Sequence, residues 1–133
     1  MTEFVIESEK LAGKSVPLEI PSNYFVIVSM TTQAAFKISV SIKDFYNTYF
    51  EESRESTAVL PIINKAFYTK SENAELKIDV PQSNRLDARM SIMDIKSDSG
   101  ELINKTISLV AEDSYDYDYN DLLLTISACK SNG

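Results

Sequence analysis

The residues best suited to chemistry form one short run near the C-terminal end of the chain. From Glu112 to Asp121 the sequence reads EDSYDYDYND, which places five carboxylates and one asparagine in ten positions. Glu112, Asp116, Asp118 and Asp121 would repel one another if they converged without a cation, and Asn120 adds a neutral oxygen between them. Ca²⁺ takes about six to eight oxygen ligands, whereas softer metals prefer cysteine or histidine. The run therefore predicts a calcium-binding loop, with a solvated acidic turn that holds no metal as the alternative.

The charge of this loop bears on the number of ions. Four converging carboxylates carry −4, so one Ca²⁺ leaves −2 and two Ca²⁺ bring the cluster to zero, which makes two neighbouring ions plausible. An EF-hand is excluded, because that loop needs glycine where this chain has Asp121 and glutamate where it has Ser127. An apolar run, LLLTIS, follows the acids and indicates a strand.

The rest of the composition narrows the function classes. The chain has 133 residues, 44% of them hydrophobic and 25% charged, so we expect one globular domain over residues 1–133. Its net charge is −7 and it has no cluster of lysine and arginine, which disfavours nucleic acid as a partner. The chain contains no histidine, and therefore lacks the usual general base and the usual zinc ligand. We expect it not to be an enzyme.

No segment indicates membrane insertion or export. No apolar run reaches the ~18 residues needed to span a bilayer, and the start, MTEFVIESEK, has neither a basic head nor a continuous apolar segment. We therefore expect synthesis in the cytoplasm, followed by release or surface association if the protein is to reach external ligands. The single cysteine, Cys129, rules out an intrachain disulfide.

Alternation of apolar and polar residues predicts an antiparallel β-sandwich of about nine strands with the acidic loop at one end. The clearest alternation runs from Phe36 to Ile42 and from Leu76 to Val80. Turns are expected at Pro81–Asn84 and in SDSGE, Ser97–Glu101. Further candidate strands are Phe4–Ile6, Tyr24–Met30, Ala58–Ile63, Ala66–Tyr68, Met90–Ile95, Ile107–Ala111 and Leu122–Ser127.

Two segments are harder to place. Asp44–Glu55 is the least strand-like part of the chain, and we expect it to form a loop, or a helical turn, over one end of the core. Pro61 lies inside an apolar run and predicts an edge strand or a bulge.

The acidic loop and its following strand resemble those of the LecB-type (PA-IIL-like) bacterial lectins, the small calcium-dependent fucose- and mannose-binding lectins. That family's loop reads E-D-x-x-D-x-D-Y-N-D, and EDSYDYDYND matches it at every ligand position. PLEIPSN, Pro17–Asn23, is similar to the family's entry into an early strand, and GELINKTISLVAED, Gly100–Asp113, resembles the hairpin that leads into its calcium loop. Weaker similarity extends from about Val16 to the end. Residues 1–15 have no counterpart in the shorter members and are expected to be an N-terminal extension, as an added edge strand or an interface arm.

The resemblance implies a lectin with two adjacent Ca²⁺ ions that bind the neighbouring hydroxyls of a monosaccharide. Residues carried over as calcium ligands are Glu112, Asp116, Asp118, Asn120, Asp121 and the terminal Gly133, whose carboxylate would reach a site in a neighbouring subunit. The carboxylates of Glu112, Asp116, Asp118 and Asp121 would also accept hydrogen bonds from the sugar hydroxyls. A homodimer or tetramer follows, because one subunit would not complete its own site.

The segment that corresponds to the family's specificity loop departs from the pattern. Here it reads TTQAA, Thr31–Ala35, which is shorter than in the family and lacks the family's asparagine ligand. A backbone carbonyl of Thr32 or Gln33 could replace it, so Thr32, Gln33 and Ala34 are the expected sugar contacts outside the acidic loop.

Three functions are therefore to be compared. The first is a bacterial lectin for glycans that contain fucose or mannose, with no nucleic-acid partner and no membrane insertion. The second is an adhesion or interaction domain with purely structural calcium and no sugar site. The third is a glycoside hydrolase, which needs two free carboxylates at a set separation. The hydrolase is disfavoured, because the clustered acids would be occupied by metal.

Overall fold

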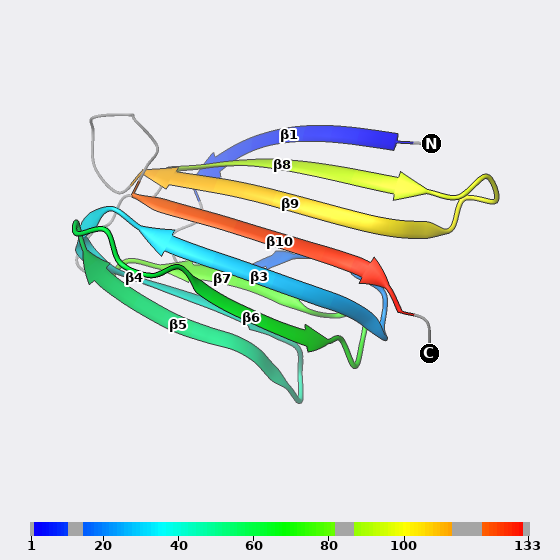
Figure 1. Ribbon diagram of the computed structural model, residues 1–133, viewed down its shortest axis with the longest axis horizontal. Helices are drawn as coiled ribbons and strands as arrows, with labels where there is room; N and C mark the ends of the chain where they lie inside the picture. The colour runs from blue at the N-terminus through cyan, green and yellow to red at the C-terminus, as the bar shows by residue number, and fades with distance from the viewer. Residues whose placement is uncertain (1, 11–14, 82–86, 113–120, 132–133) are drawn as a thin grey trace.

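The computed structural model describes residues 2–10, 15–81, 87–112 and 121–131, and the predicted antiparallel β-sandwich is confirmed (Figure 1). Within these ranges no helix is long and apolar enough to cross a membrane. The described residues form ten strands: β1 (Thr2–Lys10), β2 (Ser15–Pro17), β3 (Tyr24–Thr32), β4 (Ala34–Lys43), β5 (Thr48–Ser56), β6 (Ile63–Tyr68), β7 (Glu75–Asp79), β8 (Asp87–Lys96), β9 (Leu102–Glu112) and β10 (Leu122–Lys130).

The strands form two sheets. One has six strands in the order β1-β8-β9-β10-β3-β6, and the other has four in the order β2-β7-β4-β5. All pairings are antiparallel, and β1 is added at the edge of the six-stranded sheet through its pairing with β8. The predicted SDSGE turn joins β8 to β9, and Gly100 there has φ +89°, a conformation that glycine adopts without strain.

One hydrophobic core lies between the two sheets. Alternate residues of β3 and β10, among them Val26, Val28, Leu124 and Ile126, are buried and face the second sheet. Ile38, Val40 and Ile42 of β4 and Leu76 and Ile78 of β7 meet them from the other side. The apolar-polar alternation of the sequence thus places every second side chain in the core.

Few of the outward positions of the six-stranded sheet are charged. Residues opposite each other in the strand register share a face, and the outward positions alternate with buried ones. Among the described outward positions, the charged residues are Arg89 of β8 and, at the end of the face beside the β9–β10 loop, Asp87 and Glu112, which are opposite each other in the register. The other outward positions are Phe25, Ile27, Ser29 and Thr31 on β3; Asn64, Ala66 and Tyr68 on β6; Ser91, Met93 and Ile95 on β8; Asn104, Thr106, Ser108 and Val110 on β9; and Leu123, Thr125, Ser127 and Cys129 on β10.

Two predictions about single segments were wrong. Asp44–Glu55 is a short turn followed by β5, because Tyr49 and Phe50 are buried in the core. Phe45 and Tyr46, in the turn itself, are 85% and 95% exposed.

The second error concerns Ala58–Ile63, which was expected to be a strand. The strand β6 begins only at Ile63, and Ala58–Ile62 is the loop between β5 and β6. Proline at position 61 cannot donate a ladder hydrogen bond, which explains why pairing starts after it. Its carbonyl instead accepts a 2.7 Å hydrogen bond from Nη1 of Arg54.

Candidate functional site

Two acidic side chains of the predicted site flank the loop between β9 and β10. Glu112 is the last residue of β9, and Asp121 directly precedes β10. Ala111 and Leu122 pair in the register, and the amide of Asp121 donates a 3.1 Å hydrogen bond to the carbonyl of Ala111. The hairpin ladder therefore holds both acids at the same end of the sandwich.

Both carboxylates are withdrawn from solvent. Glu112 is 0% exposed and Asp121 is 7% exposed. Burying a carboxylate is strongly unfavourable unless it is paired, hydrogen-bonded or bound to a metal. Both side chains carry oxygen atoms of the kind that a hard divalent cation binds.

The corner between β3 and β4 lies beside the start of β10 (Figure 1). Thr32, the last residue of β3, is opposite Leu122 in the register, and the amide of Gln33 donates a 3.1 Å hydrogen bond to the carbonyl of Asp121. The structure thus brings the expected sugar-contact corner, more than eighty residues earlier in the chain, next to Asp121.

Thr32 contributes a polar atom that its described surroundings leave unsatisfied. Its side chain is 1% exposed, and within the described residues Oγ1 has no hydrogen-bond partner. A buried hydroxyl without a partner is rare in folded proteins and points to a ligand, ion or water. In the register, however, Thr32 has the same inward position as Val28 and Met30 and is opposite the buried Leu122, so its hydroxyl faces the core, whereas Glu112 has an outward position of β9.

Gln33 and Ala34 play different parts at the corner. The side-chain Nε2 of Gln33 donates a 3.4 Å hydrogen bond to the carbonyl of Ala58, which ties the corner to the β5–β6 loop. That loop exposes Val59 (94%) and Ile62 (57%) beside the candidate site. Ala34 is 2% exposed and belongs to the core.

A third acid at this end was missed by the sequence reasoning. Asp87, the first residue of β8, is opposite Glu112 in the register of β8 and β9 and is half-buried. Strand pairing could have predicted Asp87, because the strand that ends at Glu112 pairs with the strand that starts at Asp87. Asp87, Glu112 and Asp121 each make an interaction in the structure.

The remaining predicted ligands lie outside the described residues. These are Asp116, Asp118, Asn120 and Gly133. Among the residues that the structure does describe, no group of three or more His, Cys, Asp or Glu side chains is arranged to hold a metal. A complete calcium site therefore needs ligands from residues 113–120, and the full ligand set remains a prediction.

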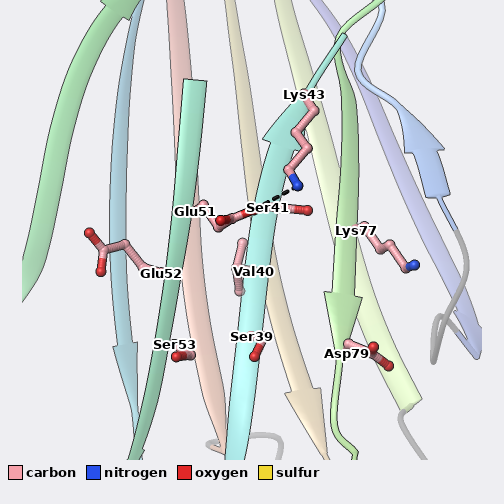
Figure 2. Close-up of a pocket in the computed structure, with 9 residues that line it drawn as sticks. All are labelled: Ser39, Val40, Ser41, Lys43, Glu51, Glu52, Ser53, Lys77 and Asp79. Carbon is pink, nitrogen blue, oxygen red and sulfur yellow. Dashed lines mark ion pairs between the residues drawn. The ribbon is translucent and has the colours of Figure 1, made fainter. Parts of the chain in front are cut away.

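A second feature is a groove of about 540 Å³ on the outer surface of the four-stranded sheet (Figure 2). Ser39 and Ser41 of β4 lie along its floor, between Glu51 of β5 and Lys77 of β7. Lys43 forms a 2.6 Å ion pair with Glu51 across it. The groove has charges of both signs and contains none of the predicted site residues.

The comparisons with known proteins agree with this architecture. The family model for "Fucose-binding lectin II (PA-IIL)" matches residues 18–130. The lectin CV2L of Chromobacterium violaceum, solved with α-methyl-fucoside, is similar with a TM-score of 0.63 and 18% identity over 82% of this chain and 91% of that chain. A high-affinity mannose-binding lectin of Ralstonia solanacearum is similar with a TM-score of 0.60 and 15% identity, again over 82% and 91% of the two chains.

A third solved structure is similar over nearly the whole chain. The C-terminal domain of the BC2L-C lectin of Burkholderia cenocepacia covers 96% of this chain and 97% of its own length, with a TM-score of 0.55 and 14% identity. A comparison with curated protein sequences finds no match. At 14–18% identity, the solved structures show only that the fold is shared. The family model matches residues 18–130, which is most of the chain, and therefore shows the family. The chain therefore belongs to the fucose-binding lectin II (PA-IIL) family, whose members bind carbohydrate and are not enzymes.

Proposed function

We propose that this protein is a calcium-dependent lectin whose binding site is built on Glu112, Asp121 and the Thr32–Gln33 corner, and that it binds monosaccharides of the fucose or mannose type. The observation that carries the proposal is the placement of two buried carboxylates, Glu112 and Asp121, beside the Thr32–Gln33 corner at one end of a sandwich of the lectin family. Fucoside and mannose binding by the two similar lectins supports the choice of sugar.

The donor atoms available at this end fit calcium. They are carboxylate, hydroxyl and carbonyl oxygens, and the chain has no histidine and only one cysteine, Cys129, at the far end of β10. Glu112 and Asp121 would hold the metal together with Asp116, Asp118 and Asn120, and two ions per subunit would balance four carboxylates. When bound, calcium supplies positive charge that coordinates neighbouring sugar hydroxyls in place of water.

The chain's own residues would orient the sugar. Carboxylate oxygens of Glu112 and Asp121 accept hydrogen bonds from sugar hydroxyls, and charge makes each such bond worth about 1.5–3 kcal/mol. Gln33, fixed at both its amide and its side chain, holds the corner against Asp121 and thereby sets the width of the site. An inverted hydroxyl would lose one such bond, so discrimination of about tenfold or more is expected.

The same proposal covers assembly and location. We expect a homodimer or tetramer, with Gly133 contributing to a neighbouring subunit's site, because several weak sugar sites gain from binding one glycan surface together. Synthesis in the cytoplasm, followed by release or surface association, would bring the protein to its glycans.

Titration calorimetry of methyl α-L-fucoside tests the proposal. The protein in about 1 mM CaCl₂ should bind the fucoside, and EDTA should abolish the heat of binding. Glu112→Gln, which keeps the side chain's shape, should weaken fucoside binding at least tenfold. A melting temperature that rises with calcium while no fucose, mannose or glycan binds would instead favour an interaction domain with structural calcium.

A further inference from the structure

The groove on the outer surface of the four-stranded sheet has its origin in the side chains of three neighbouring strands. The middle strand, β4, presents the short side chains of Ser39 and Ser41 outward. The strands on either side present longer, charged side chains, which are Glu51 on β5 and Lys77 and Asp79 on β7 (Figure 2). Short side chains between longer ones leave a hollow of about 540 Å³, a size typical of ligand sites.

A second hollow adjoins this groove on the side of the β4–β5 turn. It measures about 320 Å³ and shares Ser41, Lys43 and Lys77 with the groove, and Phe45 of the turn also lines it. The four residues of strand from Ser39 to Lys43 alone span about 13 Å. The two hollows together therefore suit an extended ligand.

The turn that carries Phe45 is firmly held. The carboxylate of Asp44 accepts hydrogen bonds from the amides of Tyr46 (2.9 Å) and Asn47 (2.8 Å) and from the hydroxyl of Ser71 (2.9 Å), which lies in the loop between β6 and β7. The side chain of Phe45 is nevertheless 85% exposed. An aromatic ring on a fixed turn offers a ligand a flat apolar surface at a low cost in conformational entropy.

The polar groups of the groove indicate which class of ligand it binds. The backbone donors and acceptors of β4 are used in its pairing with β5 and β7, so a ligand on this face meets side-chain groups. An extended peptide binds instead along a free sheet edge, where backbone groups are available. The side chains here carry hydroxyls, ammonium groups and carboxylates. A ligand hydroxyl both donates and accepts hydrogen bonds, and can therefore bind to all three kinds of group.

The charges of the groove disfavour strongly charged ligands. Three carboxylates, on Glu51, Glu52 and Asp79, and two ammonium groups, on Lys43 and Lys77, give a net charge of −1. The 2.6 Å ion pair between Lys43 and Glu51 balances one charge of each sign. A polyanion would be repelled by the remaining carboxylates and by a chain of net charge −7, and a polyamine would be repelled by the two lysines.

We propose that this groove is a second carbohydrate site, which binds a neutral oligosaccharide along β4 with the ring of Phe45 against the apolar face of one sugar. Charged side chains on both sides of the serines would donate to and accept from the hydroxyls of the ligand. The site does not need calcium, because its described lining contains none of the predicted calcium ligands. It is therefore independent of the calcium-dependent site proposed above.

An NMR titration of the ¹⁵N-labelled full chain in EDTA tests the proposal. The probes are four neutral trisaccharides: cellotriose, maltotriose, mannotriose and 2′-fucosyllactose. At least one should shift the amide signals of Ser39, Ser41 and Phe45 in a saturable manner, and should leave that of Gln33, at the calcium end, unchanged. If none of the four does so, or if only spermine or a heparin fragment does, the proposal is wrong.

Three variants locate the binding. Phe45→Ala should weaken binding of the trisaccharide at least tenfold, and Ser41→Phe, which fills the floor of the groove, should abolish it. Tyr46→Ala is the matched control and should bind as the wild type does, because Tyr46 is 95% exposed in the same turn but is not among the lining residues. Circular dichroism establishes that all three variants are folded. Equal effects of Phe45→Ala and Tyr46→Ala, or unchanged binding by Ser41→Phe, would overturn the proposal.

Calorimetry with methyl α-L-fucoside in CaCl₂ keeps the two sites apart. Ser41→Phe should bind the fucoside as the wild type does while it loses the trisaccharide in EDTA. If the wild type binds the fucoside in CaCl₂ but no trisaccharide in EDTA, the proposal of a second site fails alone. If it binds a trisaccharide in EDTA at the groove but no fucoside in CaCl₂, only the calcium-dependent site is contradicted.

Discussion

The amide of Gln33 donates a hydrogen bond of 3.1 Å to the carbonyl of Asp121, and this bond ties the β3–β4 corner to the start of β10. It joins the two parts of the candidate site that lie farthest apart in the sequence. This bond holds the backbone of Asp121 in place. The pairing of β9 with β10 fixes the position of the same residue from the other side.

Removing this bond should weaken the site. Gln33→Pro deletes the amide hydrogen, whereas Gln33→Ala keeps it and deletes only the side-chain contact with Ala58. We expect Gln33→Pro to lower fucoside affinity at least tenfold and to destabilise the fold by about 1–3 kcal/mol. Gln33→Ala should change affinity only a few-fold. Calorimetry and urea unfolding measure both effects, and equal behaviour of the two variants would show that the amide bond has no role in the site.

The sequence allowed most of the fold to be predicted, because core strands such as β3 and β10 alternate clearly between apolar and polar residues. It failed at Asp44–Glu55, where β5 is an edge strand whose outward residues are polar and whose buried pair, Tyr49 and Phe50, is adjacent instead of alternating. The local pattern does not reveal this strand, even though β5 pairs with the preceding strand β4, because the pairing contains two register shifts that interrupt a regular alternation.

The buried aromatic of that segment provides a stability test. Phe50 is 0% exposed, and Phe45 is 85% exposed. Phe50→Ala should lower the free energy of unfolding by about 3–5 kcal/mol, because it leaves a cavity in the core. Phe45→Ala should change it by less than about 0.5 kcal/mol. Denaturant titrations compare the two, and similar losses would mean that the segment does not pack as the structure shows.

The candidate site could be predicted only in part. The acidic run indicated Glu112 and Asp121, and the structure places them at the two strand ends that flank the acidic loop. Asp87 was not predicted, because it is a single acid whose position next to Glu112 depends on the pairing of β8 with β9. The sequence also could not predict that Oγ1 of Thr32 is buried without a hydrogen-bond partner. The burial of one hydroxyl depends on how the β3–β4 corner packs in three dimensions and not on its neighbours in sequence.

A buried ion pair near the other end of β9 leads to a second stability prediction. Nζ of Lys105 lies 3.7 Å from Oδ1 of Asp94, and their side chains are 8% and 16% exposed. Lys105→Met should destabilise the fold by about 2–4 kcal/mol, since it leaves the Asp94 carboxylate without its partner in a poorly solvated place. The double variant Lys105→Met/Asp94→Leu should recover most of that loss. A double variant as unstable as the single one, in urea unfolding, would contradict this account.

The β4–β5 turn should make stability depend on acid pH. A hydrogen bond from the Tyr49 hydroxyl, with others from the amide of Tyr46, from Asn47 and from Ser71, holds the pKa of the Asp44 carboxyl well below its ordinary value. A carboxyl whose pKa is lower in the folded state stabilises the fold above its unfolded pKa of about 3.9. That contribution is lost as the pH falls from about 4 toward the folded-state pKa.

Asp44→Ala measures this contribution. The variant should melt at a lower temperature than the wild type at pH 7, and the difference should shrink as the pH is lowered from 5 to 2. Asp98→Ala, at an exposed position in the β8–β9 turn, is the control and should show no such trend. A melting difference for Asp44→Ala that stays constant across this pH range would show that the carboxyl does not act through its charge.

Calcium uptake by the purified protein, measured by titration calorimetry after treatment with EDTA, tests the central claim most directly. The account predicts saturable binding of up to two Ca²⁺ per subunit, weakened at least tenfold by Glu112→Gln and by Asp121→Asn, while the exposed-site variant Asp79→Asn binds as the wild type does. Absence of calcium binding by the folded wild-type protein, or binding that both Glu112→Gln and Asp121→Asn leave unchanged, would contradict it.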